Sequence, residues 1–336
     1  ALVDLGTHEE SFGSEEANRT YNHFYRLNPH GAAGGKSKGA TGIAKLTHQL
    51  LSTTFHELTF AYKYNEFLSR LYDDPYDPRY VHRDSLNVPG FHFGVAGTTL
   101  NRFERNTKSV IAKWDITSQV DKYNLAKAGA EVQLDKVFYE NVTLVPGRAA
   151  NGREIVPFVP FIEGIETPNH DRFERTPFKL AAYVQDKIEL ESMIINAGLR
   201  FELFEPRGRI PSDPEDPNIY NPFKLEHIYR DLNNDGRIGL DEETVPNIMT
   251  VAEREVFWYK KASQKIALSP RLGIAYPITD KGIIRFSYGV FQQIPEYSQL
   301  YLGDQFKLVS AQQGIQGPFG NNELKPQRTT IYELGL

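Results

Sequence analysis

Apolar and polar residues alternate with a period of two in paired blocks along most of the chain. In "FHELTFAYKYNEF" (55–67), Leu58 and Phe60 fall on one face and Lys63 on the other. A period of two is that of a β-strand with one apolar face. The same alternation recurs in six further stretches: 109–120, 125–137, 192–204, 270–278, 282–291 and 329–336. The pattern predicts an all-β protein.

Short and long connections alternate between these predicted strands. The short ones lie at 51–54, 121–124, 190–192 and 279–282, and the long ones at about 68–108, 139–178, 205–268 and 292–327. Compact soluble domains rarely contain several loops of more than about 15 residues. Long loops at one end of every strand pair are typical of an antiparallel up-and-down transmembrane β-barrel with long extracellular loops.

A further strand pair, around 18–28 and 39–51, is expected before the first clear hairpin, which gives about ten strands. An open sheet of this size would leave two unpaired edges. We therefore interpret 1–336 as part of one β-barrel domain of a larger barrel. The glycine-rich stretch 31–39 is one residue short of a phosphate-binding loop and is expected to be a surface loop.

The two faces of the predicted strands are expected to meet different solvents. One face would contact outer-membrane lipid as a single belt that includes Leu58, Phe60, Trp114, Val132, Leu199 and Phe286. Aromatic residues near strand ends fit interfacial girdles, namely Tyr62, Tyr64, Tyr276 and Phe291. The other face is expected to be a hydrated wall of mutually paired charges, with Lys63, Lys113, Asp115, Glu131, Arg200 and Arg285.

Composition mainly excludes other classes of protein. The chain has no Cys, 21 Phe and 18 Tyr, and its net charge is −5 with both signs interspersed. It therefore lacks disulfides and thiolate sites and the basic face that a nucleic-acid partner requires. It also lacks a GxSxG elbow and an HExxH pair. We expect no enzyme activity, no catalytic residues and no cofactor-binding site.

Three stretches resemble TonB-dependent outer-membrane receptors, especially those with a carboxypeptidase-like regulatory domain ahead of the plug. They are "FKLAAYVQDKIELESMIINAGLRFELFEP" (178–206), "LSPRLGIAYPITDKGIIRFSYGVFQQIP" (268–295) and "NNELKPQRTTIYELGL" (321–336). The last one has Gln327 where the family usually has an acid. Residues 40–138 match the family pattern more loosely.

The resemblance implies energised import of a scarce nutrient through a barrel of about 22 strands that is gated by a plug. It implies that the plug and the C-terminal end of the barrel lie outside 1–336. It implies a location in the bacterial outer membrane. The implied partners are outer-membrane lipid, the TonB energy-coupling complex through an N-terminal part outside this sequence, a nutrient ligand and a surface lipoprotein. An alternative is a calcium-stabilised β-rich adhesin or glycan-binding protein without transport activity. A secreted β-rich hydrolase is a third, with no nucleophile or metal cluster to support it.

The stretch "DLNNDGRIGLDE" (231–242) has the ligand spacing of an EF-hand calcium loop. Its expected ligands are Asp231, Asn233, Asp235, the backbone carbonyl of Arg237 and a bidentate Glu242, with the turn at Gly236. Pro246 cuts off a full exiting helix, so a paired EF-hand sensor is not expected. A structural Ca²⁺ in the extracellular loop 205–268 is the prediction, and a solvated Asx-Gly turn is the alternative.

Overall fold

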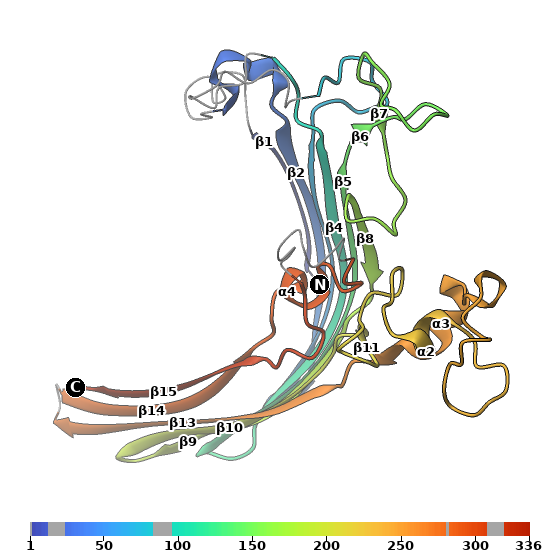
Figure 1. Cartoon of the computed structure of the whole chain (residues 1–336). Coiled ribbons are helices and arrows are strands. Elements are labelled where there is room, and N and C mark those ends of the chain that lie inside the picture. Colours follow the sequence, from blue (N-terminus) through green and yellow to red (C-terminus); the bar gives the residue numbers. More distant parts are fainter. Residues whose placement is uncertain (1, 13–23, 83–95, 280–281, 308–318) are drawn as a thin grey trace.

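The computed structural model describes residues 2–12, 24–82, 96–279, 282–307 and 319–336. Its main element is an antiparallel sheet of 11 strands in the order β1-β2-β3-β4-β5-β9-β10-β13-β14-β15, with β8 added beside β5. The sheet is strongly curved and open, and its two edges do not meet (Figure 1). The strands are β1 (Leu2–Phe12), β2 (Gly34–Leu51), β3 (Thr54–Arg70), β4 (Asn101–Gln119), β5 (Asn124–Thr143), β8 (His170–Arg175), β9 (Phe178–Leu190), β10 (Met193–Glu205), β13 (Lys265–Thr279), β14 (Gly282–Gln293) and β15 (Gln327–Gly335).

The connections fall into two classes at opposite ends of the strands. Between β4 and β5 the chain turns tightly, because the side chain of Asp121 accepts hydrogen bonds from the backbone N–H groups of Tyr123 and Asn124 at 2.7 and 2.9 Å. This is an Asx turn. At the other end, the long connections contain short elements: η1 (Phe24–Leu27), η2 (Pro29–Gly31), β6 (Val145–Pro146), β7 (Pro160–Phe161), β11 (Arg209–Pro211), α2 (Leu225–Ile228), η4 (Val245–Asn247), α3 (Val251–Trp258), β12 (Tyr259–Lys261) and α4 (Tyr297–Tyr301).

The first strands extend well past the length that a bilayer requires. β5 has 20 residues and β4 has 19, whereas about 9–11 tilted residues suffice to span the membrane. The outer half of β5 pairs with β8 and its inner half with β9. Pro177 lies between these two partners and has no N–H to give to the ladder, so one long strand is interrupted at this point.

Two details of the sequence-based prediction are wrong. The first strand is Leu2–Phe12, paired with β2 in register from Leu2↔Lys45 to Phe12↔Gly35. Within the expected strand 18–28, residues 24–27 form a 3₁₀ helix and 18–23 lie outside the described residues. The stretch 31–39 is not a surface loop throughout, because β2 begins at Gly34. Among the described helices, none is long and apolar enough to cross a membrane.

The register brings apolar side chains of neighbouring strands into continuous rows on one face. One row runs through Leu46, Leu58, Trp114, Ala130, Ala182, Phe201 and Leu268. Of the six residues predicted for the belt, Phe60, Trp114, Leu199 and Phe286 are exposed, and Leu58 and Val132 are half-buried. This is the convex face of the sheet (Figure 1).

Candidate functional site: the concave wall of the sheet

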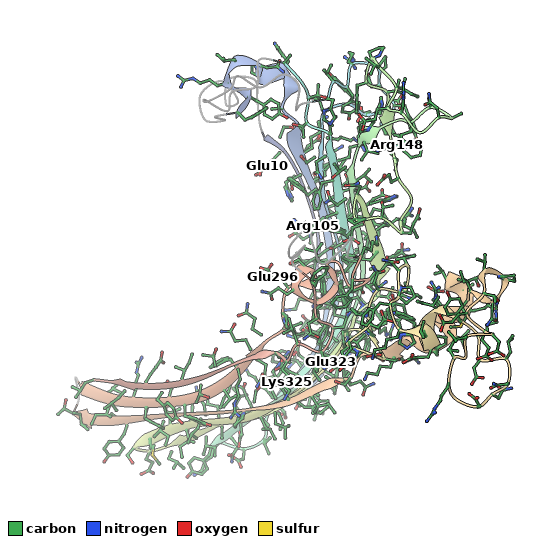
Figure 2. All side chains as sticks on the ribbon, viewed as in Figure 1. Glu10, Arg105, Arg148, Glu296, Glu323 and Lys325 are labelled. Atoms are coloured by element: carbon green, nitrogen blue, oxygen red, sulfur yellow. The ribbon has the colours of Figure 1, made fainter. Side chains whose placement is uncertain are left out.

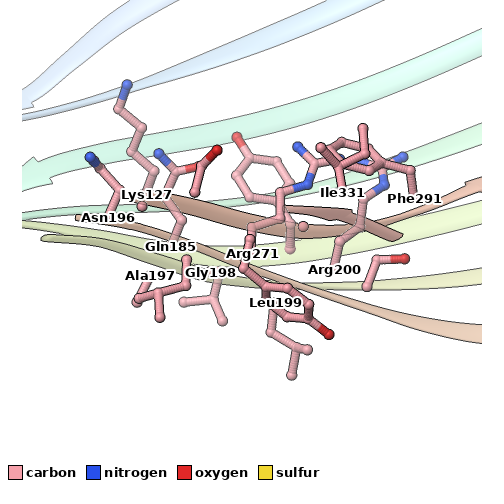
Figure 3. Close-up of a pocket in the computed structure, with 18 of the residues that line it drawn as sticks. Lys127, Gln185, Asn196, Ala197, Gly198, Leu199, Arg200, Arg271, Phe291 and Ile331 are labelled. Atoms are coloured by element: carbon pink, nitrogen blue, oxygen red, sulfur yellow. The ribbon is translucent and has the colours of Figure 1, made fainter. Parts of the chain in front are cut away.

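A cavity of about 680 Å³ lies along the concave face, over β5, β9, β10, β13 and β14. Figure 3 shows the polar side chains of Lys127, Gln185, Asn196 and Arg271 on one side of the ribbon and Leu199 on the other. Because successive residues of a strand point to opposite faces, Arg200 lines this cavity while Leu199 belongs to the convex face.

Several charged residues of this wall are paired with one another. Lys45 lies 2.8 Å from Glu57, Lys113 lies 3.0 Å from Asp115, and Arg200 lies 2.9 Å from Glu202. The predicted hydrated wall of paired charges therefore holds for Lys113, Asp115 and Arg200. Lys63, Glu131 and Arg285 make no ion pair within the described part of the chain.

A glycine makes room for a hydrogen bond across the wall. Asp115, Gly129 and Tyr183 lie opposite one another on β4, β5 and β9, and the Tyr183 hydroxyl donates to Asp115 Oδ1 at 2.6 Å. A Cβ at position 129 would come within 2.6 Å of both side chains. The close approach of the Tyr183 ring therefore requires Gly129, and it fixes the relative position of three strands.

Arg271 and Phe291 correct one expectation from the sequence. Phe291 was predicted to belong to an interfacial girdle, but it lines the cavity, and the Arg271 guanidinium lies 4.7 Å from its ring centroid. Side chains alternate between the two faces along β14. Phe286 and Tyr288 are at even positions and lie on the convex face, so Phe291, at an odd position, lies on the concave face. Arg271 makes no ion pair among the described residues, so its charge is free to meet a ligand or another segment.

A segment of the last long connection, residues 294–307, packs against the concave wall. Figure 1 shows its helix α4 inside the bend of the sheet. Leu300 and Tyr301 of α4 form a buried cluster with Val137, Phe173 and Phe204 of the wall. Tyr301 donates to the carbonyl of Pro206 at 2.6 Å, and burial raises the pKa of its phenol. We call residues 294–307 the docked segment.

Buried charges hold the far end of the docked segment. Asp304 is only 3% exposed and lies 2.5 Å from the Arg175 guanidinium. Lys307 donates to the carbonyl of His170 at 2.6 Å and lies 3.5 Å from Asp171. Burial raises the pKa of Asp304, against the opposing effect of Arg175, and burial lowers the pKa of Lys307. A buried pair of this kind fixes one position of the segment, because either charge alone would be costly to bury.

Another long connection builds a small folded unit, residues 213–262, which we call the outer subdomain. Asp216 is buried and accepts hydrogen bonds from the backbone N–H of Lys224 at 3.1 Å and from His227 Nδ1 at 2.8 Å. Trp258 is also buried, and its indole N–H donates to the carbonyl of Pro217. Figure 1 shows α2 and α3 of this unit on the opposite side of the sheet from α4.

The predicted calcium loop lies within the outer subdomain. Glu242 is buried, and its carboxylate accepts hydrogen bonds from Leu232, Asn233 and Gly239 N–H groups at 2.7, 3.2 and 3.0 Å. The N–H groups of Gly239 and Leu232 lower the pKa of this carboxyl group. Asp231 Oδ2 accepts a hydrogen bond from Gly236 N–H, while Asp231 Oδ1 is inaccessible to solvent and has no hydrogen-bond partner in the described part of the chain.

The loop thus has the turn of the motif, with φ of 80° at Gly236. Its carboxylates do not converge, however: no group of three His, Asp or Glu residues in the described ranges is arranged around one metal position.

Residues 4–336 match the family model described as TonB dependent receptor-like, beta-barrel. The chain belongs to the TonB-dependent receptor family. The family and the barrel fold predicted from the sequence are therefore confirmed.

Several solved structures are similar to this chain at low sequence identity. The ferric-catecholate import receptor Fiu from K12 E. coli, in its closed form, is 13% identical over 99% of this chain and 46% of that chain, with a TM-score of 0.47. The siderophore receptor PiuA from Acinetobacter baumannii is 12% identical, with coverages of 99% and 44% and a TM-score of 0.47. The copper transporter OprC is 11% identical, with coverages of 90% and 37% and a TM-score of 0.47.

This TonB-dependent receptor chain spans less than half of the length of these structures. The sequence matches none of the curated proteins. Barrels of this family lie in the bacterial outer membrane, as the sequence predicts, and the convex face supplies the apolar surface that lipid covers. The concave wall and the docked segment therefore line the inside of the barrel.

Proposed function

We propose that this chain is the barrel part of a receptor that takes up a nutrient across the outer membrane, with energy from the TonB complex. The family match over residues 4–336 carries this proposal. The concave wall supports it, since a cavity of about 680 Å³ lined by Arg271, Arg200 and Lys127 offers polar contacts along the inside of the barrel. The family match also favours uptake over the adhesin alternative.

The uptake proposal is tested with the complete receptor in its own cells. We expect deletion of its gene to abolish accumulation of at least one nutrient from a panel of labelled iron complexes, copper complexes and oligosaccharides. A proton-motive-force uncoupler should abolish the same accumulation. Unchanged accumulation of every nutrient, together with lost attachment to surfaces, would replace uptake by adhesion.

We propose further that a surface lipoprotein contacts the extracellular side of this receptor at the outer subdomain. Leu240, Val245 and Val256 are large apolar residues on this unit with most of their surface exposed, and exposed apolar residues favour a protein partner. Crosslinking from Val256→Cys in whole cells tests this. A crosslinked lipid-modified protein is the expected product, and crosslinking only to other copies of the receptor would contradict it.

We also propose that the loop 231–242 binds Ca²⁺ as a structural ion. The complete spacing from Asp231 to Glu242 supports this, as does the buried Asp231 Oδ1, which has no hydrogen-bond partner among the described residues. Binding requires Glu242 to exchange its three N–H contacts for the ion, a rearrangement confined to one side chain and its loop. The ion would order the outer subdomain and would take no part in chemistry.

Metal removal tests the calcium proposal. We expect about 1 mM Ca²⁺, the range of extracellular calcium sites, to slow hydrogen exchange of residues 213–262, and EGTA to reverse the effect. Glu242→Gln should remove the response, while the neighbouring exposed Glu243→Gln should retain it. Equal exchange with and without Ca²⁺ in the unmodified receptor would leave the solvated turn as the correct interpretation.

A further inference from the structure

Four aromatic side chains form a continuous row on the concave face of β3, β4, β5 and β8. The ring centroids of Phe67 and Phe103 are 5.8 Å apart, those of Phe103 and Tyr139 are 5.3 Å apart, and those of Tyr139 and Phe173 are 4.9 Å apart. Offset and edge-to-face contacts at such distances are favourable. These residues lie in the outer halves of long strands, toward the extracellular loops.

The docked segment covers only one end of this aromatic row. Tyr301 of α4 contacts Phe173 at a ring distance of 5.8 Å, and both residues are buried. Phe67 and Phe103, at the other end, are only half-buried. Packing against the docked segment explains why Phe173 is aromatic. It does not explain why Phe67 and Phe103, at the open end of the row, are aromatic.

Arg105 lies within the open end of the row. It is directly opposite Phe67 on β3 and Tyr139 on β5, and its side chain is exposed. Figure 2 places Arg105 in the concave part of the molecule, where Glu296 is also labelled. Arg105 makes no ion pair among the described residues, in contrast to Arg175 and Arg200.

The immediate surroundings of Arg105 on this face are neutral. Its neighbours on β3, β4 and β5 by register and alternation are Asn65, Phe67, Ser69, Phe103, Thr107, Val137, Tyr139 and Asn141. Asp171 of β8, an acid on the same face, already accepts a hydrogen bond from Gly303 N–H and lies beside Lys307. The guanidinium of Arg105 beside these half-buried rings therefore has no paired anion among the described residues.

We propose that Phe67, Phe103, Tyr139 and Arg105 form a subsite for an anionic aryl group of the transported ligand, such as an aryl carboxylate. The rings receive the flat face of the aryl group, and Arg105 donates hydrogen bonds to the two carboxylate oxygens. A neutral sugar would use the rings and leave the charge of Arg105 unmatched. This assignment rests on the proposed uptake function and names the ligand chemistry for it.

Three small probes separate the contributions of charge and ring. We would measure their binding to the complete receptor in nanodiscs: 2-naphthoate is anionic and aromatic, 2-naphthamide is neutral and aromatic, and cyclohexanecarboxylate is anionic without an aromatic ring. Maltoheptaose represents a neutral saccharide. We expect 2-naphthoate to bind best, and Arg105→Ala to weaken it about tenfold or more, as for loss of a charge-assisted hydrogen bond.

Two further variants distinguish recognition from support of the fold. Arg105→Lys should retain part of the affinity, and Phe103→Ala should weaken both naphthyl probes alike. The matched control is Arg172→Ala, because Arg172 lies 5.5 Å from the Phe138 ring on the opposite face of the same strands. That variant should leave the affinity for 2-naphthoate unchanged.

Unchanged 2-naphthoate affinity in Arg105→Ala would overturn the subsite. Maltoheptaose binding that is lost in both Arg105→Ala and Phe103→Ala would also overturn it and assign a saccharide. Failure of the subsite is distinguishable from failure of uptake, because nutrient accumulation by cells with the unmodified receptor does not depend on these probes.

Discussion

The convex and concave faces of this sheet are built from the same strands and obey opposite rules. On the convex face, Trp114 and Leu199 are 42% and 45% exposed, and their neighbours by register are apolar. On the concave face, charges occur and several are paired, either across neighbouring strands, as Lys45 on β2 with Glu57 on β3, or along one strand, as Lys113 with Asp115 on β4. Surrounding solvent explains the difference: lipid accepts apolar side chains and water accepts paired charges.

The long connections on the two sides of the sheet also differ. The docked segment lies on the concave side and buries Leu300, Tyr301 and Asp304 against the wall. The outer subdomain lies on the other side of the sheet and has its own small core around Trp258 and Ile219. The docked segment therefore depends on the barrel wall for its structure. Most of the buried contacts of the outer subdomain, in contrast, are made within the subdomain.

The dependence of the docked segment on the wall predicts the largest effect. Arg175→Leu leaves Asp304 buried without its partner, which typically costs about 3–5 kcal/mol. We expect the segment to detach and trypsin to cleave after Lys307 more than about 100 times faster, if cleavage follows the open population. Limited proteolysis of the complete receptor in nanodiscs measures this rate.

The double variant Arg175→Leu/Asp304→Leu controls for the buried charge. Removal of both partners leaves no unpaired group, so protection of Lys307 should recover in part. Cleavage that is equally fast in the single and the double variant would mean that the apolar contacts of Leu300 and Tyr301 cannot hold the segment. Slow cleavage in the single variant would show that the pair does not hold the segment.

A matched pair of variants on adjacent residues tests the two faces directly. Leu199→Arg places a charge on the lipid side, at a cost of about 2–4 kcal/mol near the middle of the bilayer. We expect little of this variant to assemble in the outer membrane, as measured by heat-modifiable mobility of membrane fractions. Arg200→Leu changes the concave side, where Glu202 can meet water instead, and should assemble normally. Equal assembly of both would contradict the assignment of faces.

The strands and the faces were predictable because they depend on local alternation. Leu58, Phe60 and Trp114 repeat every second residue, and a tight turn follows each hairpin strand. β1 was misplaced because its sequence, "LVDLGTHEESF", carries apolar residues mainly at one end. Its position follows from pairing with β2 rather than from its own pattern. Phe291 was assigned to the wrong face because nearness to a strand end does not determine toward which face a side chain points.

The inner site was far less predictable. Arg175 and Asp304 are 129 residues apart in the chain, and Lys307 and His170 are 137 apart. No local pattern encodes such contacts. The sequence does not show that Phe67, Phe103 and Tyr139 form a row. They become neighbours only through the register of β3 with β4 and that of β4 with β5. The calcium loop is the opposite case: its spacing is local and complete, and its occupancy stays a prediction.

The smallest expected effect concerns the outer subdomain and its pH dependence. Glu253 accepts hydrogen bonds from the backbone N–H and hydroxyl of Thr250, the N-cap of α3, and pairs with Arg230 at 2.7 Å. These contacts lower the pKa of Glu253 to about 2, from 4.5. The folded form therefore gains stability above pH 4.5 and loses it as the pH falls toward 2. We expect hydrogen exchange of α3, corrected for its intrinsic pH dependence, to accelerate over this range while β9 and β10 stay protected. Glu253→Gln should exchange at a pH-independent corrected rate, and an unchanged slope in that variant would assign the effect to another carboxyl group.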